Sequence, residues 1–195
     1  IWTEDDMTRF AEAAKKLDRL HVVDGLRLAA FTGLRRADLV TLEWAHVGET
    51  AIRKLALKSS RKRRHFVTVP IIAELRSLLE ELRERPRGEG VETVLVNSYG
   101  LPWTGDGFGG SFNRVRDEAD IVHFDEDTKE RKRKHLHDVR GTFCTKLLTE
   151  GGISDQEAAD IMGWSVAQVS SIRRIYVDDS SLISSIARRI AGGGG

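Results

Sequence analysis

Tyr176 is the residue whose possible chemistry stands out first. It is one of only two tyrosines, and it lies in SSIRRIYVDDSS two residues after the pair Arg173 and Arg174. A tyrosine at helical spacing usually packs in a core, but a phenol close to positive charge can also act as a nucleophile. The stretch alone leaves both interpretations open, so the choice depends on the other reactive residues.

Two arginine motifs have the residue types that bind a phosphate. In TGLRRADL, Arg35 follows a glycine corner, and Asp38 comes three residues later, where its carboxylate can orient the guanidinium. In HLHDVR, His137 and Arg140 are also three residues apart and share one helical face. Arginine binds two phosphate oxygens in its plane, and histidine donates a hydrogen bond or transfers a proton. Taken alone, Arg35 and Asp38 are also consistent with a surface ion pair that contributes little to stability, and His137 and Arg140 with a solvated helix face.

Trp164, in IMGWSV, offers one indole N–H donor and precedes Tyr176 by twelve residues. Its alternative role is simple packing. The order of these motifs along the chain therefore carries more weight than any one of them.

The elements that must position these residues are mostly helical. Thr3 and Asp6 predict a capped helix at the start of the chain. VDGLRLAAFTGLRRADLVTLEW predicts two helices that break near Thr32 and Gly33, because glycine readily adopts the backbone shape of such a corner. Further helices are predicted around SFNRVRDEAD and throughout the chain from His137 onward, with Ser154 as an N-cap. The segment IIAELRSLLEELRER predicts an amphipathic helix with Ile71, Leu75, Leu78, Leu79 and Leu82 on one face.

The remaining patterns predict a small antiparallel sheet. AIRKLALK and RHFVTVP flank the turn SSRK and predict a β-hairpin that ends at Pro70. VETVLVNS is a candidate for a short strand. GLPWTGDGFGG is predicted to be a loop, and its glycines do not have the spacing of a phosphate-binding motif. The acidic segment FDED is predicted to be another loop. The predicted fold class is α+β, a mostly α-helical domain with one small antiparallel sheet.

The distribution of charge matters more than its sum. The net charge is only +1, but the segment 52–64 holds seven Lys or Arg and no acid. The segment 129–135 holds five Lys or Arg against one Glu, while acids gather in TEDD, EELRE and FDED. Such clustering suits a molecule with one phosphate-facing side, although either run alone is typical of a solvated surface.

Length and composition favour a single intracellular domain. The chain has 195 residues, 40% of them hydrophobic, and lacks both an apolar run long enough for a membrane span and a signal peptide pattern. Its single cysteine, Cys144, cannot form an intrachain disulfide, which fits a reducing cytoplasm. We expect one domain over residues 1–190 and a glycine-rich tail over 191–195 that is typical of a linker.

Taken together, the motifs resemble those of the tyrosine recombinase (phage integrase) family. The resemblance runs from about Thr3 to about Arg189, and its specificity lies in five short motifs in the right order: TGLRRADL, the basic hairpin, HDVR, MGW and RRIYVD. It implies a helical catalytic domain with a small sheet that cuts and rejoins DNA. It also implies an upstream core-DNA-binding domain, which we expect to lie outside this chain.

The resemblance assigns roles residue by residue. Tyr176 corresponds to the nucleophile, and Asp38 corresponds to a residue that supports the first arginine. The implied phosphate-binding and proton-transfer residues are Arg35, His137, Arg140 and Trp164. A general-acid lysine is expected on the hairpin, where Lys58 is favoured, Lys62 is the alternative and Lys54 fits less well. The implied DNA contacts are Arg61, Lys62, Arg63, Arg64, Lys132, Arg133, Lys134 and Arg173, of which Arg173 could instead support Tyr176 locally.

Three departures from the family pattern affect this assignment, one of which is the open choice of the hairpin lysine between Lys58 and Lys62. Trp164 stands where most members carry histidine, so it can donate a hydrogen bond but cannot transfer a proton. The interval from Trp164 to Tyr176 is about three residues longer than in many members, just under one helical turn. Whether the phenol of Tyr176 reaches the phosphate across this longer interval does not follow from the sequence.

The implied function is site-specific DNA recombination through a 3′-phosphotyrosyl intermediate. The expected partners are double-stranded DNA and three further copies of the chain in a homotetramer, with the apolar helix 181–190 docking between protomers or packing on its own domain. No cofactor and no metal are expected, and the expected location is the cytoplasm of a bacterium, near the nucleoid. The alternatives are a type IB topoisomerase-like enzyme, an inactive DNA-binding module descended from a recombinase and, more remotely, a metal-dependent nuclease.

Overall fold

The computed structural model describes residues 1–57, 66–125 and 128–178. The chain divides into two compact units, Ile1–Thr142 and Phe143–Gly195, each of which is described by itself. In the described residues no helix is long and apolar enough to cross a membrane. The fold is mostly helical with short antiparallel strand pairs, as the sequence predicts.

The first unit is built on a helical core. Its helices are α1 (Glu4–Lys16), α2 (Leu20–Thr32), α3 (Arg36–Val40), α4 (Ala73–Arg83) and α5 (Gly105–Glu118), with short 3₁₀ turns at Trp44–His46 and Leu136–Asp138. The predicted capping box at the start of α1 is present: Thr3 accepts a hydrogen bond from the Asp6 main chain, and Asp6 accepts one from Thr3. Helix α4 buries Leu75, Leu78, Leu79 and Leu82, the predicted apolar face apart from Ile71, which precedes the helix.

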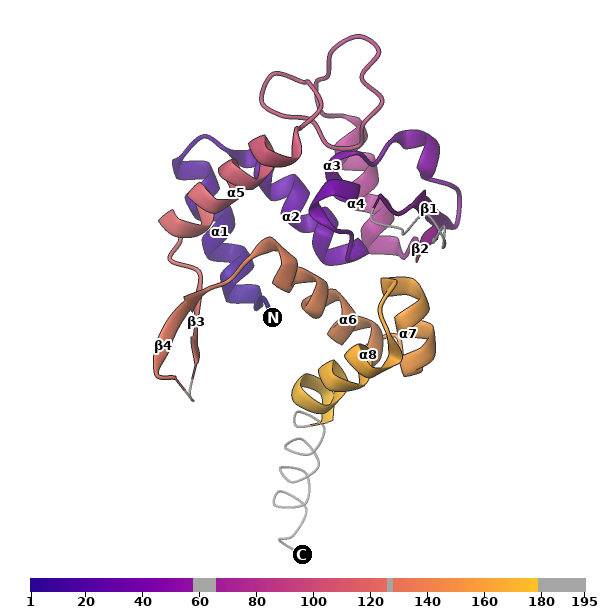
Figure 1. Ribbon diagram of the computed structural model, residues 1–195. Helices are drawn as coiled ribbons and strands as arrows, with labels where there is room; N and C mark the ends of the chain where they lie inside the picture. The colour runs from indigo at the N-terminus through magenta and orange to yellow at the C-terminus, as the bar shows by residue number, and fades with distance from the viewer. Residues whose placement is uncertain (58–65, 126–127, 179–195) are drawn as a thin grey trace, which may run out of the picture. The chain divides into compact units, whose positions relative to one another are not determined.

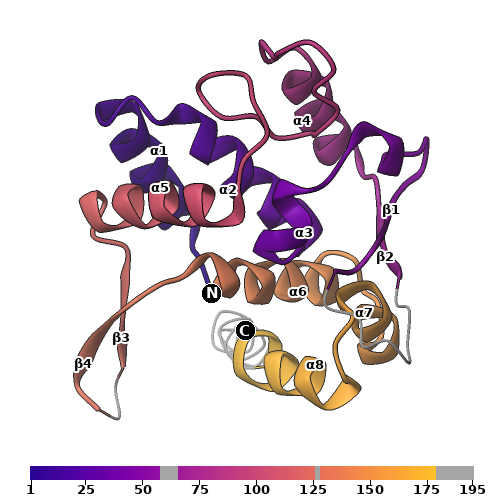
Figure 2. The ribbon, with the colours of Figure 1, turned by 45° about the horizontal axis from the view of Figure 1, so that its top comes forward.

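Helices α1, α2 and α5 lie side by side (Figures 1 and 2) and enclose an aromatic cluster. The ring centroids of Trp2, Phe10 and Phe112 lie 5.0–5.6 Å apart in tilted and edge-on pairs. Gly25 lets α2 approach this cluster, because a Cβ there would lie 2.4 Å from the ring of Phe108. Burial of these rings fixes the position of α5 against α1 and α2.

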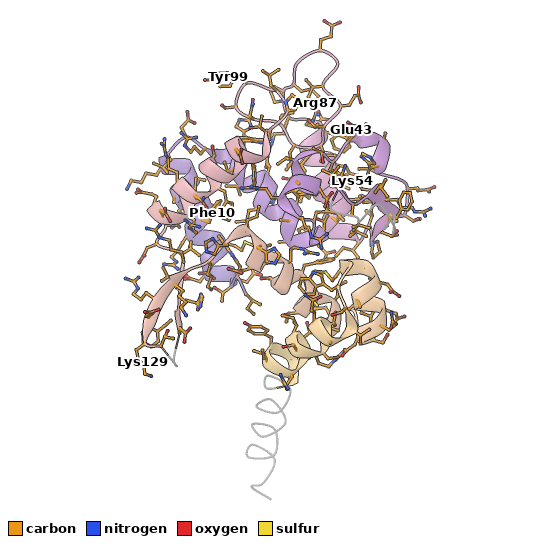
Figure 3. All side chains as sticks on the ribbon, in the orientation of Figure 1. Phe10, Glu43, Lys54, Arg87, Tyr99 and Lys129 are labelled. Carbon is orange, nitrogen blue, oxygen red and sulfur yellow. The ribbon has the colours of Figure 1, made fainter. Side chains whose placement is uncertain are left out.

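Two β-hairpins complete the first unit. Strands β1 (Ala51–Leu55) and β2 (Phe66–Pro70) form the predicted antiparallel pair, with Ala51 opposite Pro70 and Leu55 opposite Phe66. Strands β3 (Val122–Asp125) and β4 (Glu130–Arg133) form a second antiparallel hairpin, where the sequence analysis expected a loop and a basic surface run. Figure 3 shows Lys129 at the far end of this second hairpin.

Two predictions about the segment 91–110 were wrong. VETVLVNS forms no strand of its own: Thr93 and Val96 each make an isolated bridge, while Val94, Leu95 and Val96 are buried. The glycines of GDGFGG belong to helix α5 rather than to a loop. Thr104 caps this helix by accepting a hydrogen bond from the Gly107 main chain at 3.0 Å. The cap stabilises the first turn, in which the glycines have a low helix propensity.

The second unit is helical in the part that the structure describes. Helix α6 (Val139–Thr149) begins in the first unit, and α7 (Asp155–Met162) and α8 (Val166–Ile172) follow it. Ser154 caps α7 as predicted, and Gly163 ends it in the left-handed conformation with φ 61°. The chain then enters a π-helical segment, Arg173–Asp178. The predicted apolar helix 181–190 lies outside the described residues.

Candidate active site

Arg35 lies at the corner between α2 and α3. Gly33 ends α2 in the left-handed conformation, with φ 59° and ψ 17°, where a side chain would be strained. Leu34 is buried directly after it, and Arg35 has extended backbone as the residue before α3. The guanidinium makes no hydrogen bond or ion pair within the described part of the chain, so its donors are available to a ligand.

Arg140 connects the start of α6 to this corner. Its Nε donates a 2.6 Å hydrogen bond to the Gly33 carbonyl oxygen, across 107 residues of sequence. Only 4% of the residue is exposed. A buried guanidinium that binds a carbonyl at one edge is held in a fixed plane, which sets the direction of its remaining N–H groups.

Both arginines line one cavity together with His137. The cavity has a volume of about 350 Å³, and it is lined by Leu34, Arg35, Arg36, Gly109, Phe112, Asn113, His135, Leu136, His137 and Arg140. All of these residues belong to the first unit. Two motifs separated by about a hundred residues thus contribute to one basic hollow, which suits an anionic ligand.

The imidazole of His137 is biased toward its neutral form. Burial lowers its pKa below the ordinary value of 6.5, and the positive charges of Arg140 and Arg35 lower it further, against the opposing effect of Asp138. A neutral imidazole can accept a proton, so His137 is suited to act as a base at neutral pH.

This bias predicts a specific pH dependence. A rate that depends on proton transfer to His137 should keep more than half of its plateau value at pH 6.5 and should decrease at lower pH, as His137 takes up a proton. An NMR titration of the ring protons, assigned with His137→Gln, should give a midpoint below 6.5 that moves upward in Arg35→Gln. A midpoint at or above 6.5 in the unchanged protein would contradict the prediction.

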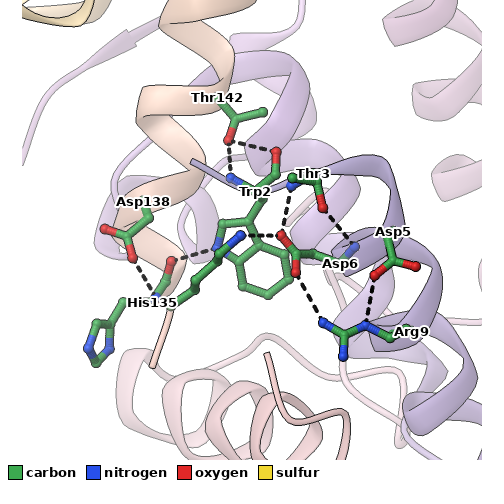
Figure 4. Close-up of polar contacts among 9 residues, drawn as sticks. Trp2, Thr3, Asp5, Asp6, Arg9, His135, Asp138 and Thr142 are labelled. Carbon is green, nitrogen blue, oxygen red and sulfur yellow. Dashed lines mark hydrogen bonds and ion pairs between the residues drawn. The ribbon is translucent and has the colours of Figure 1, made fainter. Parts of the chain in front are cut away.

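A polar network holds the segment that carries His137 and Arg140 (Figure 4). The indole nitrogen of Trp2 donates to the His135 carbonyl at 3.0 Å, and the Trp2 main-chain nitrogen donates to the Thr142 hydroxyl at 2.8 Å. The Asp138 carboxylate accepts from the His135 main chain at 2.7 Å. The first residues of the chain are therefore part of the support of the cavity.

Lys134 belongs to the same network rather than to the DNA-facing surface that the sequence suggested. Its ammonium lies 2.5 Å from the Asp6 carboxylate, and the two side chains are only 10% and 4% exposed. Burial alone would raise the pKa of Asp6, but the hydrogen bonds from Lys134 and Thr3 keep it below its ordinary value of 3.8. A lysine paired in this way is not available to a DNA phosphate.

Lys134→Met is accordingly expected to destabilise the protein by about 2 kcal/mol, because it removes the hydrogen bond from Lys134 to the buried Asp6 carboxylate and leaves Arg9, at 3.3 Å, as its remaining cationic partner. Lys132→Met is the matched control, since Lys132 pairs with Asp125 at the surface and is 43% exposed. The control should change the free energy of unfolding by less than about 1 kcal/mol. Urea denaturation followed by circular dichroism compares the two. Equal effects would show that the Lys134 pair does not support the fold.

Two other predicted residues occupy structural positions. Asp38 is buried, and its carboxylate accepts a 2.9 Å hydrogen bond from the Leu57 main chain, with no contact to Arg35 among the described interactions. It therefore fixes the end of the first hairpin arm. Lys54 is also buried, and its ammonium donates to the Thr41 carbonyl at 3.0 Å.

The remaining predicted residues have varied positions. Arg133 is exposed and lies 3.4 Å from Asp117. Arg173 donates to the Asp155 carboxylate at 2.6 Å and to the Ile153 carbonyl at 3.1 Å, which favours the local-support role. The hairpin residues Lys58, Arg61, Lys62, Arg63 and Arg64 lie outside the described residues.

Trp164 and Tyr176 belong to the second unit. Trp164 follows the left-handed Gly163, and its main-chain nitrogen donates to the Ala159 carbonyl at 3.0 Å. Tyr176 is half-buried within the π-helical segment. Single π-helical turns inside helices occur frequently at functional sites. In this chain the π-helical segment begins within the interval from Trp164 to Tyr176, which is longer than in the family pattern.

The sequence analysis missed three polar residues that line the cavity, Arg36, Asn113 and His135. Arg36 is the second arginine of TGLRRADL and could have been noted from its neighbour. His135 opens the motif HLHDVR, two residues before His137, and could have been noted in the same way, whereas Asn113 is brought to the cavity by tertiary packing alone. No group of three or more His, Cys, Asp or Glu in the described residues is placed to hold a metal ion.

The chain belongs to the phage integrase family, whose model matches residues 2–181. A comparison with curated protein sequences gave no match.

Solved structures support the same fold. The lambda integrase (75–356) dimer bound to a COC′ core site has a TM-score of 0.68 at 20% identity, over 88% of this chain and 58% of that one. XerA recombinase has a TM-score of 0.65 at 21% identity, over 96% and 64%. The Tn1549 transposon integrase in complex with circular intermediate DNA has a TM-score of 0.64 at 18% identity, over 91% and 61%. The chain thus spans about three fifths of these proteins.

Proposed function

We propose that the chain is the catalytic part of a site-specific DNA recombinase that cuts and rejoins strands through a 3′-phosphotyrosyl intermediate. The observation that carries the proposal is the cavity that unites Arg35, His137 and Arg140, with the guanidinium of Arg35 held free of other described partners. Three groups of this kind in one hollow match the needs of a phosphodiester under attack.

The reaction follows from the chemistry of these groups. The Tyr176 oxygen forms a bond to the scissile phosphorus while the phenolic proton passes to a base, for which neutral His137 is suited. Negative charge grows on the non-bridging oxygens, where Arg35, Arg140 and Trp164 donate hydrogen bonds. The bond from phosphorus to the 5′-oxygen breaks, and the leaving oxygen takes a proton from the hairpin lysine, for which Lys58 remains our choice over Lys62.

The covalent step explains why the proposal includes no cofactor. The 3′-phosphotyrosine retains the energy of the broken phosphodiester until a second 5′-hydroxyl attacks it, so neither ATP nor a metal is required. Joining strands from two sites needs several active sites, so we propose that the protein works as a tetramer on paired DNA duplexes. One of its structural neighbours is a lambda integrase tetramer bound to a Holliday junction.

A nicked suicide duplex tests this function. After cleavage, a short 5′-hydroxyl strand diffuses away and the adduct accumulates; the duplex should carry the site found next to the gene. With chelator present, a denaturing gel should show a covalent protein–DNA adduct, and peptide mapping should place the nucleotide on the segment 170–181. A bound duplex without any adduct would overturn the proposal in favour of a DNA-binding module. Relaxation of supercoils without strand exchange would favour the topoisomerase alternative.

A further inference from the structure

Gly109 is an unusual residue for its place in the fold. It lies buried within α5, where glycine destabilises a helix relative to alanine. A Cβ added at this position would lie 2.3 Å from Nη1 of Arg36 and 3.3 Å from its Cζ. The absent side chain thus leaves a groove on α5 in which the guanidinium of Arg36 lies.

The groove holds Arg36 at the candidate active site. Helices α3 and α5 lie side by side (Figure 2), and Arg36 and Gly109 both line the cavity that contains Arg35, His137 and Arg140. The Arg36 side chain is 50% exposed. Two consecutive arginines, Arg35 and Arg36, therefore line the same cavity. Their positive charges repel each other unless an anion is bound between them.

A purely structural role does not account for this arrangement. The ionic partner of Arg36 in the described part of the chain is Asp106, at 3.7 Å, and the Asp106 side chain is fully exposed. Exposed pairs at such distances contribute little to stability. The weak ion pair between Arg36 and Asp106 therefore does not explain why α5 carries a glycine that makes room for the Arg36 side chain.

We propose that Arg36 binds a non-bridging oxygen of a second DNA phosphate, next to the one that Arg35 binds, and that Gly109 exists to give it room. This inference rests on the proposed function, since it assumes that the cavity receives a DNA strand. Arg36 then positions the strand, and Arg35 and Arg140 contact the phosphate that reacts.

Gly109→Ala and Gly110→Ala form a matched pair that tests the proposal. Both changes place the same residue in the same helix, but a Cβ at Gly110 meets nothing within 4 Å. At Gly109 the new methyl displaces only the mobile end of an arginine, so the fold should persist. Because alanine favours a helix over glycine, neither variant should melt at a lower temperature than the unchanged protein.

The measurement is affinity for a fluorescein-labelled DNA duplex at several KCl concentrations. Each phosphate contact contributes about 0.9 to the slope of log affinity against log salt. Gly109→Ala and Arg36→Gln should each reduce the slope by about that amount, while Gly110→Ala should retain the original slope. Arg35→Gln serves as the reference for loss of one phosphate contact.

The outcomes separate this proposal from the function on which it rests. If Arg36→Gln keeps the original slope, or if the two alanine variants behave alike, the role of Arg36 is overturned, whether or not the suicide duplex yields an adduct. If the unchanged protein gives neither an adduct nor salt-dependent binding, the proposed function itself fails and the role of Arg36 fails with it. A lower melting temperature in Arg36→Gln with an unchanged slope would assign the residue to the fold alone.

Discussion

Tyr176→Phe is expected to abolish the covalent adduct on a suicide duplex. The substitution removes one oxygen atom, the proposed nucleophile, and retains the ring that is half-buried in the π-helical segment. Binding of the duplex should be retained, since the cavity residues lie in the other unit. The adduct is measured on a denaturing gel and binding by fluorescence anisotropy, so that loss of chemistry and loss of affinity are read separately.

Tyr99→Phe is the matched control. Tyr99 lies in a loop, and 85% of the residue is exposed (Figure 3). Its described hydrogen bond joins its main-chain nitrogen to the Asn97 side chain and involves no cationic residue. This variant should form the adduct at the rate of the unchanged protein. An adduct that survives in Tyr176→Phe would show that another residue attacks the phosphate. Loss of the adduct in both variants would point to damage to the fold.

Arg35→Ala is expected to slow cleavage by roughly 10²–10³-fold, the usual cost of losing one fixed donor to a developing oxyanion. Because the guanidinium has no protein partner in the described residues, its removal breaks no internal contact. The free energy of unfolding should therefore change by less than about 0.5 kcal/mol. A large catalytic defect in a fully stable variant is the signature of a residue kept for a ligand.

Single-turnover cleavage and urea denaturation measure the two effects. Arg27→Ala is the control for loss of an arginine, since Arg27 forms an exposed pair with Glu81 on the surface of the same unit. It should leave the cleavage rate within a factor of about two. A similar loss of rate in Arg27→Ala and Arg35→Ala would show that general positive charge, and not the site, is what the reaction needs.

The parts of the fold that the sequence could predict are those decided by nearby residues. The capping box of Thr3 and Asp6 and the corner at Gly33 depend on neighbours within four positions, and both are present as expected. The first hairpin has the predicted strands because β-strand alternation is also a local signal. The spacing within HLHDVR predicted His137 and Arg140 on one helical face; both line the cavity, but His137 lies in the 3₁₀ turn Leu136–Asp138 and Arg140 in α6.

Distant partners decided the rest. Lys134 looked like a DNA contact in a basic run, but Asp6, 128 residues away, determines its burial. The glycines of α5 looked like a loop because local propensity opposes a helix there, and packing of Phe108 and Phe112 overrides it. VETVLVNS has the composition of a strand, but Thr93 pairs with Glu43, which directly precedes the 3₁₀ turn Trp44–His46, and only isolated bridges form.

The long-range contacts around the cavity also determine when it can exist during synthesis of the chain. Trp2 meets Thr142 across 140 residues, and Gly33 meets Arg140 across 107. At 5–20 residues per second, the ribosome takes on the order of 10 s to make the stretch between Trp2 and its partner. A nascent chain, or one truncated ahead of Arg140, therefore lacks the assembled cavity. The cavity therefore assembles in a late step of folding, after residue 142 has been made.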